Sequence, residues 1–389
     1  MLIEGRFEPM HDFLLTQDEL RARRGLKWRK YPSDVLPAWV ADLDFKVAPA
    51  VQAAFARLVD HQDYVYGMPA DLESLYAGFA QWMTRRHGWR PDPALTTATA
   101  DVVQGVAASL VAYSAPGDGV IVQTPAYPPF LRVVDGTARR LVENPLIPGN
   151  RFNLDLDGLR EAASHARVIL LCSPHNPTGR VFEMEELRQI ASIAEDHDLT
   201  IVSDEIHADI TYGTAEHIPM ETVAAERTVT LTSATKSFNI PGARAALVHF
   251  GSAALKERFD RVFPEHILGR PSRFGVDATI AAWSDSESWF DDVMQYLAGN
   301  RALVAEWAGS REGIGHIPPE ATFLAWLDCR ELGLPGSPYD FFLESAKVAL
   351  SDGRDFGGPG SGHVRLNFGT SKEILSEILA RMSHALDEV

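Results

Sequence analysis

Residues 167–207, RVILLCSPHNPTGRVFEMEELRQIASIAEDHDLTIVSDEIH, contain the pattern that decides the fold. Two apolar runs of strand length, residues 167–172 and 199–203, enclose a segment at 183–197 whose apolar residues recur with helical spacing. Acidic residues in the first turn of that segment suit a helix N-terminus. The order strand, helix, strand is typical of an α/β layered domain.

The same alternation continues on both sides of this stretch. Further apolar runs of strand length occupy residues 119–123, 228–232 and 245–250. These runs are apolar on both faces, as expected for strands of a mainly parallel sheet covered by helices. In such a sheet, ligands bind outside the carboxyl ends of the strands, so residues that directly follow the strands are the candidates for chemistry.

The character of the sequence changes after about Asp285. A long helix is predicted at 288–308, and a final helix at 372–386, with shorter elements at 322–328, 339–347 and 364–368 between them. The glycine-rich stretch 353–362 is expected to be a flexible loop. We therefore predict a large domain at 46–285 and a smaller α+β domain at 286–389, which the N-terminal segment 1–45 joins.

Composition and charge narrow the classes of function. Among 389 residues, 53 acidic against 36 basic side chains give a net charge of −17, which disfavours nucleic acid and anionic membranes as partners. No apolar run reaches the roughly 18 residues of a membrane-spanning helix, and the N-terminus does not resemble a signal peptide, so a cytoplasmic location is expected. Two cysteines are too few for a disulfide framework, and the histidines have no metal-ligand spacing, so no metal site is predicted.

Three polar residues follow successive predicted strands: Asn176, Asp204 and Lys236. Each has an ordinary explanation when taken alone, since an Asn caps turns, an Asp caps helices and most lysines are solvated. Taken together they supply an amine, a carboxylate and an amide donor at one sheet edge. An aldehyde cofactor with a ring nitrogen and a phenolic oxygen needs that set of partners.

The surrounding motifs resemble a known superfamily. Residues 176–179 (NPTG), 203–207 (SDEIH) and 233–239 (SATKSFN) resemble the fold-type I, class I/II aminotransferase superfamily, whose cofactor is pyridoxal 5'-phosphate. Residues 27–28 (KW), 34–45 (DVLPAWVADLDF) and 364–369 (VRLNFG) are similar to the MalY/PatB-type cystathionine β-lyase (C–S lyase) group. The resemblance runs from about residue 20 to the C-terminus and implies the aspartate aminotransferase-like fold, an α/β architecture.

The resemblance implies roles for individual residues toward the cofactor. Lys236 would form the Schiff base with the aldehyde and later carry the proton, Asp204 would pair with the protonated ring nitrogen, and Asn176 would hydrogen-bond the ring oxygen. Tyr127 would stack on the ring. The phosphate would be bound by backbone N–H groups at Gly105 and Val106, by Ser233 and by Arg244. His207 is either a partner near the ring or a satisfied core histidine.

The resemblance also implies how the substrate and a second subunit bind. Arg365 would bind the substrate α-carboxylate, a task suited to the guanidinium fork, together with Asn176 and the backbone N–H of Ala41. Tyr66 would reach the phosphate of the partner subunit, which implies a homodimer with shared sites.

The implied activity is α,β-elimination from an S-substituted L-cysteine, giving a thiol, pyruvate and ammonia. The same catalytic residues serve transamination, and Arg244 favours that alternative mildly, because lyase-type members often lack an arginine there. A regulatory or interaction protein that binds the cofactor is a third and weaker hypothesis.

Overall fold

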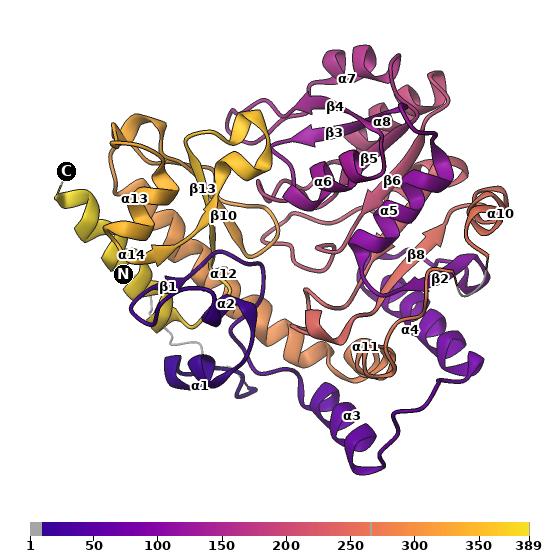
Figure 1. The fold of residues 1–389 in the computed structure, drawn as a ribbon, viewed down its shortest axis with the longest axis horizontal. Helices are drawn as coiled ribbons and strands as arrows, with labels where there is room; N and C mark the ends of the chain where they lie inside the picture. The colour runs from indigo at the N-terminus through magenta and orange to yellow at the C-terminus, as the bar shows by residue number, and fades with distance from the viewer. Residues whose placement is uncertain (1–9, 265–266, 389) are drawn as a thin grey trace.

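The computed structural model describes residues 10–264 and 267–388 (Figure 1). Its main feature is a seven-stranded sheet in the order β2-β8-β7-β6-β5-β3-β4. The strands are β2 (Thr96–Thr99), β3 (Gly119–Thr124), β4 (Arg140–Pro145), β5 (Val168–Cys172), β6 (Thr200–Asp204), β7 (Thr228–Thr232) and β8 (Ala246–Phe250). All five predicted strands are present, while the edge strands β2 and β4 escaped prediction because they are less apolar.

Helices cover both faces of this sheet, as its apolar strands predict. Val120 and Val122 of β3 pack with α5, α6 and α10 on one face, and Ile121 packs with α7 and α8 on the other. The helices of the whole chain are α1 (Gln17–Ala22), α2 (Leu26–Arg29), α3 (Pro49–Asp60), α4 (Pro69–His87), α5 (Val102–Tyr113), α6 (Pro128–Gly136), α7 (Leu156–Ala163), α8 (Met184–Asp196), α9 (Glu221–Ala224), α10 (Ala253–Val262), α11 (Arg273–Asp285), α12 (Glu287–Gly309), α13 (Pro338–Glu344) and α14 (Lys372–Asp387).

Strand β8 runs antiparallel to β7, whereas β3, β4, β5, β6 and β7 are parallel to one another. The difference has a local cause. A parallel neighbour needs a crossover that returns the chain to the other end of the sheet, usually through a helix. The connection 233–245 contains only the 3-10 turn Pro241–Ala243, so the chain turns back at the same edge. That connection carries Lys236, which therefore lies at the carboxyl ends of the parallel strands.

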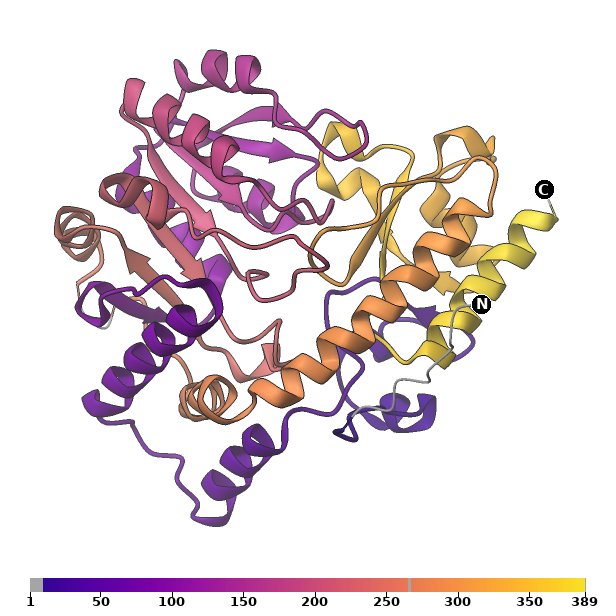
Figure 2. The ribbon, with the colours of Figure 1, turned by 180° about the vertical axis from the view of Figure 1, so that it is seen from behind.

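A second, smaller sheet is antiparallel, in the order β12-β13-β10-β9, and packs with α12, α13 and α14 (Figure 2). Its strands are β9 (Gly315–His316), β10 (Leu324–Asp328), β12 (Ser351–Asp352) and β13 (His363–Asn367). Strand β1 (Leu36–Pro37) pairs with β11 (Val348–Ala349), which ties the N-terminal segment to this unit. The predicted fold class is confirmed, and the boundaries at 46 and 286 stay a prediction.

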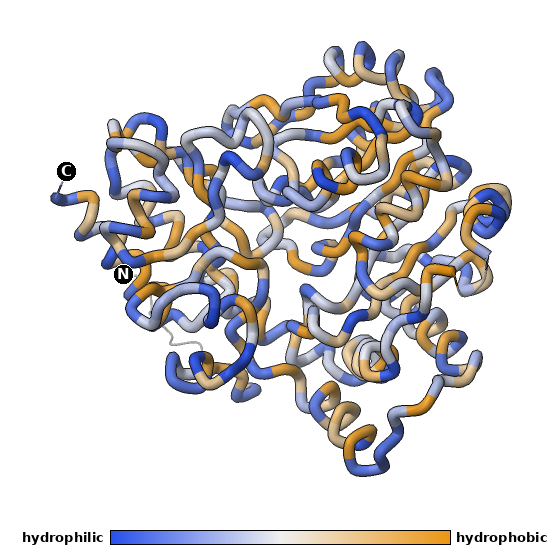
Figure 3. The backbone as a smooth tube through the Cα atoms, in the orientation of Figure 1, coloured by the Kyte–Doolittle hydropathy of each residue, from blue (hydrophilic) through white to orange (hydrophobic). Residues whose placement is uncertain are grey.

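One buried cluster connects the two units. It runs from Phe79 of α4 and Trp283 of α11 through Val293 of α12 to Leu324 of β10. On the outer helices, such as α3, hydrophobic residues alternate with hydrophilic ones (Figure 3), so each helix buries one face. Within the described ranges, no helix is long and apolar enough to cross a membrane.

The glycine-rich stretch 353–362 is packed, which corrects the expectation of a flexible loop. It forms two 3-10 turns, Gly353–Phe356 and Gly358–Gly360. Phe356 is buried, and its carbonyl accepts a hydrogen bond from the Ala126 N–H of the large unit at 2.8 Å. Glycine is required at 360 because a Cβ there would lie 1.9 Å from the Gly353 carbonyl oxygen.

Candidate active site

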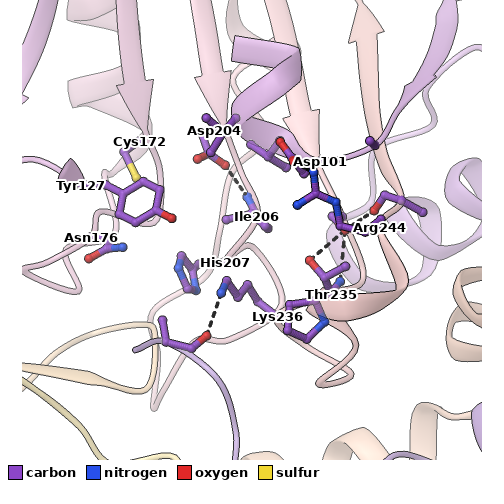
Figure 4. A pocket seen from close by; sticks show the side chains of 17 residues that line it. Asp101, Tyr127, Cys172, Asn176, Asp204, Ile206, His207, Thr235, Lys236 and Arg244 are labelled. Atoms are coloured by element: carbon purple, nitrogen blue, oxygen red, sulfur yellow. Dashed lines mark hydrogen bonds and ion pairs between the residues drawn. The ribbon is translucent and has the colours of Figure 1, made fainter. Parts of the chain in front are cut away.

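A cavity of about 210 Å³ opens at the carboxyl ends of β5, β6 and β7 (Figure 4). Its walls come from those strand ends, from the start of α5, from the connection 233–245 and from the N-terminal segment at Ala41. Predicted site residues line it: Ala41, Tyr127, Asn176, Asp204, His207, Ser233, Lys236 and Arg244. Residues separated by more than 200 positions in the sequence therefore meet in one cavity.

Lys236 presents its amine to this cavity. The Nζ atom donates to the Ala41 carbonyl at 2.7 Å and lies 3.9 Å from Asp42 Oδ1. Burial lowers the pKa of Lys236 from its ordinary value, and the nearby Asp42 carboxylate opposes that shift. An amine with a lowered pKa is a better nucleophile and proton acceptor at neutral pH. Ala41, which was expected to offer its N–H to a substrate, contacts Lys236 through its carbonyl oxygen.

Asp204 ends β6 and is only 4% exposed. Its Oδ1 accepts a hydrogen bond from the Ile206 N–H at 3.0 Å. Burial raises the pKa of this carboxyl to about 7, because one backbone donor and the nearby Lys236 only partly offset the loss of water. The site therefore suits a cationic group in the cavity, which would hold Asp204 in its ionised form.

Asn176 and Arg365 form one polar unit across the two parts of the molecule. Arg365 Nη1 donates to Asn176 Oδ1 at 2.8 Å, and its Nη2 donates to the Trp39 carbonyl and the Ser351 hydroxyl. Arg365 is buried, its Nε has no hydrogen-bond partner in the described chain, and burial lowers its pKa to about 10. A buried guanidinium held by neutral acceptors fits an anionic ligand such as a carboxylate.

The segment 39–45 is fixed above the cavity by buried polar contacts. Lys27 forms an ion pair with Asp44 at 2.7 Å, with both side chains 4% exposed or less, and Trp28 donates to the same carboxylate. Asn367 donates to the carbonyls of Val40 and Asp42. These contacts give a physical reason for the N-terminal motif: they place the Ala41 carbonyl against Lys236.

His207 and Tyr127 are the ring-bearing residues of the cavity. His207 is buried, its Nδ1 has no partner among the described residues, and burial lowers its pKa to about 3, so the imidazole is neutral. An unpartnered ring nitrogen in a cavity residue favours a role near the ring over that of a satisfied core histidine. The Tyr127 ring also lines the cavity, beside Cys172, and burial raises its pKa. Both stay uncharged at neutral pH.

The start of α5 corrects one sequence prediction. The helix begins at Val102, three residues before Gly105, so Gly105 and Val106 lie in its second turn and are buried in the sheet core. A Cβ at Gly105 would lie 2.5 Å from Leu231 of β7, which explains the glycine by close packing. Val102 and Val103 line the cavity instead, and the first N–H groups of a helix lack partners within it. The start of α5 at Val102 could have been predicted from Asp101, because Asp is a preferred N-cap residue.

The remaining predicted anion ligands lie at the same end of the cavity. Ser233 Oγ donates to the Ala245 carbonyl at 2.6 Å and contacts Thr235, which also lines the cavity and escaped prediction. Arg244 has a left-handed backbone, with φ of 61°, and its Nη2 lies 2.5 Å from Asp101 Oδ2. A helix N-terminus and a guanidinium together suit a phosphate group.

Tyr66 lies outside this cavity. It belongs to the connection between α3 and α4 and is 100% exposed in the single chain. Its neighbours Tyr64, Val65 and Met68 are also exposed.

The cavity thus matches the three parts of pyridoxal phosphate. Lys236 suits the aldehyde, Asp204 suits a protonated ring nitrogen, and the α5 N-terminus with Arg244 suits the phosphate. Within the described ranges, no group of three or more His, Cys, Asp or Glu side chains is arranged to hold a metal ion.

Comparisons with known proteins agree with this site. The family model described as "Aminotransferase class I and II" matches residues 40–382. The chain is 34% identical to a cystathionine beta-lyase of Corynebacterium glutamicum, covering 95% of this chain and 98% of the relative, and 32% identical to cystathionine beta-lyase PatB of Bacillus subtilis with the same coverage. The crystal structure of cystalysin from Treponema denticola, which contains a pyridoxal 5'-phosphate cofactor, superposes with a TM-score of 0.89 at 28% identity, covering 95% of this chain and 97% of that one. The chain belongs to the class I and II aminotransferase family.

Proposed function

We propose that this protein is a pyridoxal phosphate-dependent carbon–sulfur β-lyase acting on S-substituted L-cysteines of the cystathionine type. The observation that carries the proposal is the full-length similarity to cystathionine β-lyases, combined with a cavity that holds an amine and a buried carboxylate. The buried Arg365 guanidinium, which donates to the cavity residue Asn176, lies next to them. The reaction splits the substrate into a thiol, pyruvate and ammonia.

Pyridoxal phosphate supplies an aldehyde that takes up the substrate amine and an aromatic ring that accepts electrons from Cα. Asp204 keeps a cationic ring nitrogen charged, since a carboxylate buried at 4% exposure gains most from an opposite charge in contact with it. Asn176 Nδ2 would be the donor to the ring oxygen, because Asn176 Oδ1 already accepts from Arg365. The Tyr127 ring, which lines the cavity, would pack on the flat face of the cofactor.

Arg365 binds the substrate α-carboxylate and so orients the Cα–H bond toward Lys236. Lys236 Nζ takes the Cα proton, and the Ala41 carbonyl and Asp42 carboxylate, 2.7 and 3.9 Å away, stabilise the resulting ammonium. The Cβ–S bond breaks, the sulfur leaves with a proton as a thiol, and water converts the three-carbon remainder to pyruvate and ammonia. Loss of Lys236 removes both the nucleophile and the proton carrier.

Transamination is the second candidate, and the family-model match over residues 40–382 together with Arg244 at the phosphate end favours it. The two are separated by products. The purified enzyme with cystathionine should release pyruvate and free thiol in equal amounts, with no added 2-oxo acid. A requirement for a 2-oxo acid, with a new amino acid formed and no pyruvate from cystathionine, would reject the lyase.

We further propose that the enzyme is a homodimer in which Tyr66 completes the phosphate site of the partner. The exposed apolar stretch 64–68 supports this, since fully exposed aromatic clusters mark interfaces. Sedimentation should give twice the mass of the chain, 42.8 kDa. Mixing inactive Lys236→Ala with Tyr66→Phe subunits should restore part of the activity only if the sites are shared.

A further inference from the structure

A carboxylate lies inside the subsite proposed for the cofactor phosphate. Asp101 lines the cavity between the start of α5 and Arg244 (Figure 4). Its Oδ2 lies 2.5 Å from Arg244 Nη2, and its Oδ1 accepts from the Gln104 N–H at 2.7 Å. Two sources of positive potential at this end, the helix N-terminus and the guanidinium, are therefore both engaged by one acidic side chain.

The capping role alone does not require the charge of Asp101. A helix N-cap needs one oxygen that accepts from the third residue of the helix, and Asn or Ser provides it as well as Asp. Here Oδ1 makes that contact, and the Gln104 side chain accepts from the N–H of Ala100, the residue before the cap, at 2.8 Å. The second oxygen is left for Arg244, where its negative charge opposes any second anion.

The ion pair is accessible enough to exchange partners. The Arg244 side chain is 58% exposed and that of Asp101 is 32% exposed. An exposed pair contributes little to stability, so its opening costs little. A phosphate dianion at the N–H groups of Val102 and Val103 would draw Arg244 toward itself and away from Asp101.

We propose that Asp101 competes with the cofactor phosphate for Arg244, so that this chain holds pyridoxal phosphate more weakly, and exchanges it more readily, than the same cradle would with a neutral cap. This inference rests on the cofactor site of the proposed function. Asp101 then sets the affinity of the protein for the cofactor phosphate and takes no part in bond breaking.

The test compares pyridoxal phosphate with pyridoxal, which lacks the phosphate, as titrants of the full-length apoprotein. Asp101→Asn keeps the capping oxygen and removes the charge. It should bind pyridoxal phosphate up to about fivefold more tightly at low salt, because the phosphate no longer has to break the exposed ion pair between Asp101 and Arg244. Binding of pyridoxal should not change. The gain should shrink at high salt.

Asp101→Ser, a second neutral cap, guards against a folding defect and should reproduce the tighter binding. The competition also predicts a coupling with Arg244. In an Arg244→Ala background, where pyridoxal phosphate should bind more weakly, Asp101→Asn should give a gain well below that seen with Arg244 present, because there is no ion pair left to break.

Unchanged or weaker binding of pyridoxal phosphate by both neutral variants would overturn the inference. So would an equal gain for pyridoxal, or an undiminished gain in the Arg244→Ala background. If the wild-type apoprotein bound neither vitamer, the proposed function itself would fail. If it bound both and the variants matched wild type, only the inference about Asp101 would fail.

Discussion

The two ends of the cavity hold their charges in opposite ways. At the inner end, Lys236, Asp204 and Asn176 line the cavity, and Arg365 donates to Asn176. Asp204 and Arg365 are buried, at 4% and 5% exposure, and their hydrogen bonds are to neutral partners. At the outer end, formed by Asp101, Arg244 and Ser233, an acid and a base face solvent and neutralise each other.

The difference shows which end depends on a ligand. Buried charges without opposite partners raise the free energy of the empty protein, and a ligand of complementary charge removes that cost. The inner end is therefore expected to gain stability when a ligand of complementary charge binds. The outer end is already satisfied, so a ligand there must replace an existing contact. Four changes test this contrast.

The largest effect is expected from Lys236→Ala at the inner end. Without this amine, pyruvate release from cystathionine should fall by about 10⁴-fold or more, because the nucleophile and the proton carrier are lost together. The matched outer-end variant, Arg244→Ala, should keep most of its turnover when pyridoxal phosphate is saturating. Comparable losses in the two variants would break the contrast.

The second effect concerns the wall above the inner end. Lys27→Met leaves the Asp44 carboxylate buried without its cation, which should lower the free energy of unfolding by about 3–5 kcal/mol. Asp101→Asn at the outer end removes an exposed pair and should cost about 0–1 kcal/mol. Urea unfolding of both variants measures the difference; a Lys27→Met cost below that of Asp101→Asn would contradict it.

The third effect is a pH dependence of the apoprotein. The pKa of Asp204 is raised in the fold from 3.8 to about 7, so the folded state binds the proton more tightly than the unfolded state. The free energy of folding is therefore less favourable at pH values where the carboxyl is ionised in the unfolded chain. This cost is absent below about pH 4, grows as the pH rises, and reaches its full size above about pH 7, with about 1.4 kcal/mol for each unit of the pKa shift. Asp204→Asn should therefore be more stable than wild type at pH 8, and the advantage should fade toward pH 5.

Adding pyridoxal phosphate provides the control for that prediction. A cationic ring nitrogen beside Asp204 should remove the penalty in wild type, so the loaded proteins should lose the difference seen at pH 8. A stability difference that does not vary with pH between 5 and 8 would show that Asp204 is not an isolated buried acid.

The smallest effect is expected from Arg365→Lys. Lysine keeps the charge but not the fork that contacts both Asn176 and the substrate carboxylate, so kcat/KM for cystathionine should fall by about 10- to 100-fold. Steady-state kinetics measures this. The dissociation constant for pyridoxal phosphate should stay within about twofold of the wild-type value, because Arg365 is remote from the phosphate end.

Sequence by itself predicted that Asn176, Asp204 and Lys236 lie close together, because each follows a strand and the carboxyl ends of neighbouring parallel strands share one edge. All three line one cavity. The sequence placed the helix N-terminus at residues 104–106, later than the observed start of α5 at Val102, since a glycine is also common at a helix start. It also missed the antiparallel direction of β8, which depends on how the connection 233–245 folds.

Only the tertiary structure decided which groups touch. Arg365 meets Asn176 across 189 positions, the Ala41 carbonyl meets Lys236 across 195, and Asp101 meets Arg244 at the other end. Periodicity and turn propensity act over a few residues and specify elements, whereas these contacts depend on how the small unit, the N-terminal segment and the large sheet pack together. The tertiary structure therefore determines which charges of the site are paired and which are isolated, and with them the expected response of the site to ligands and to pH.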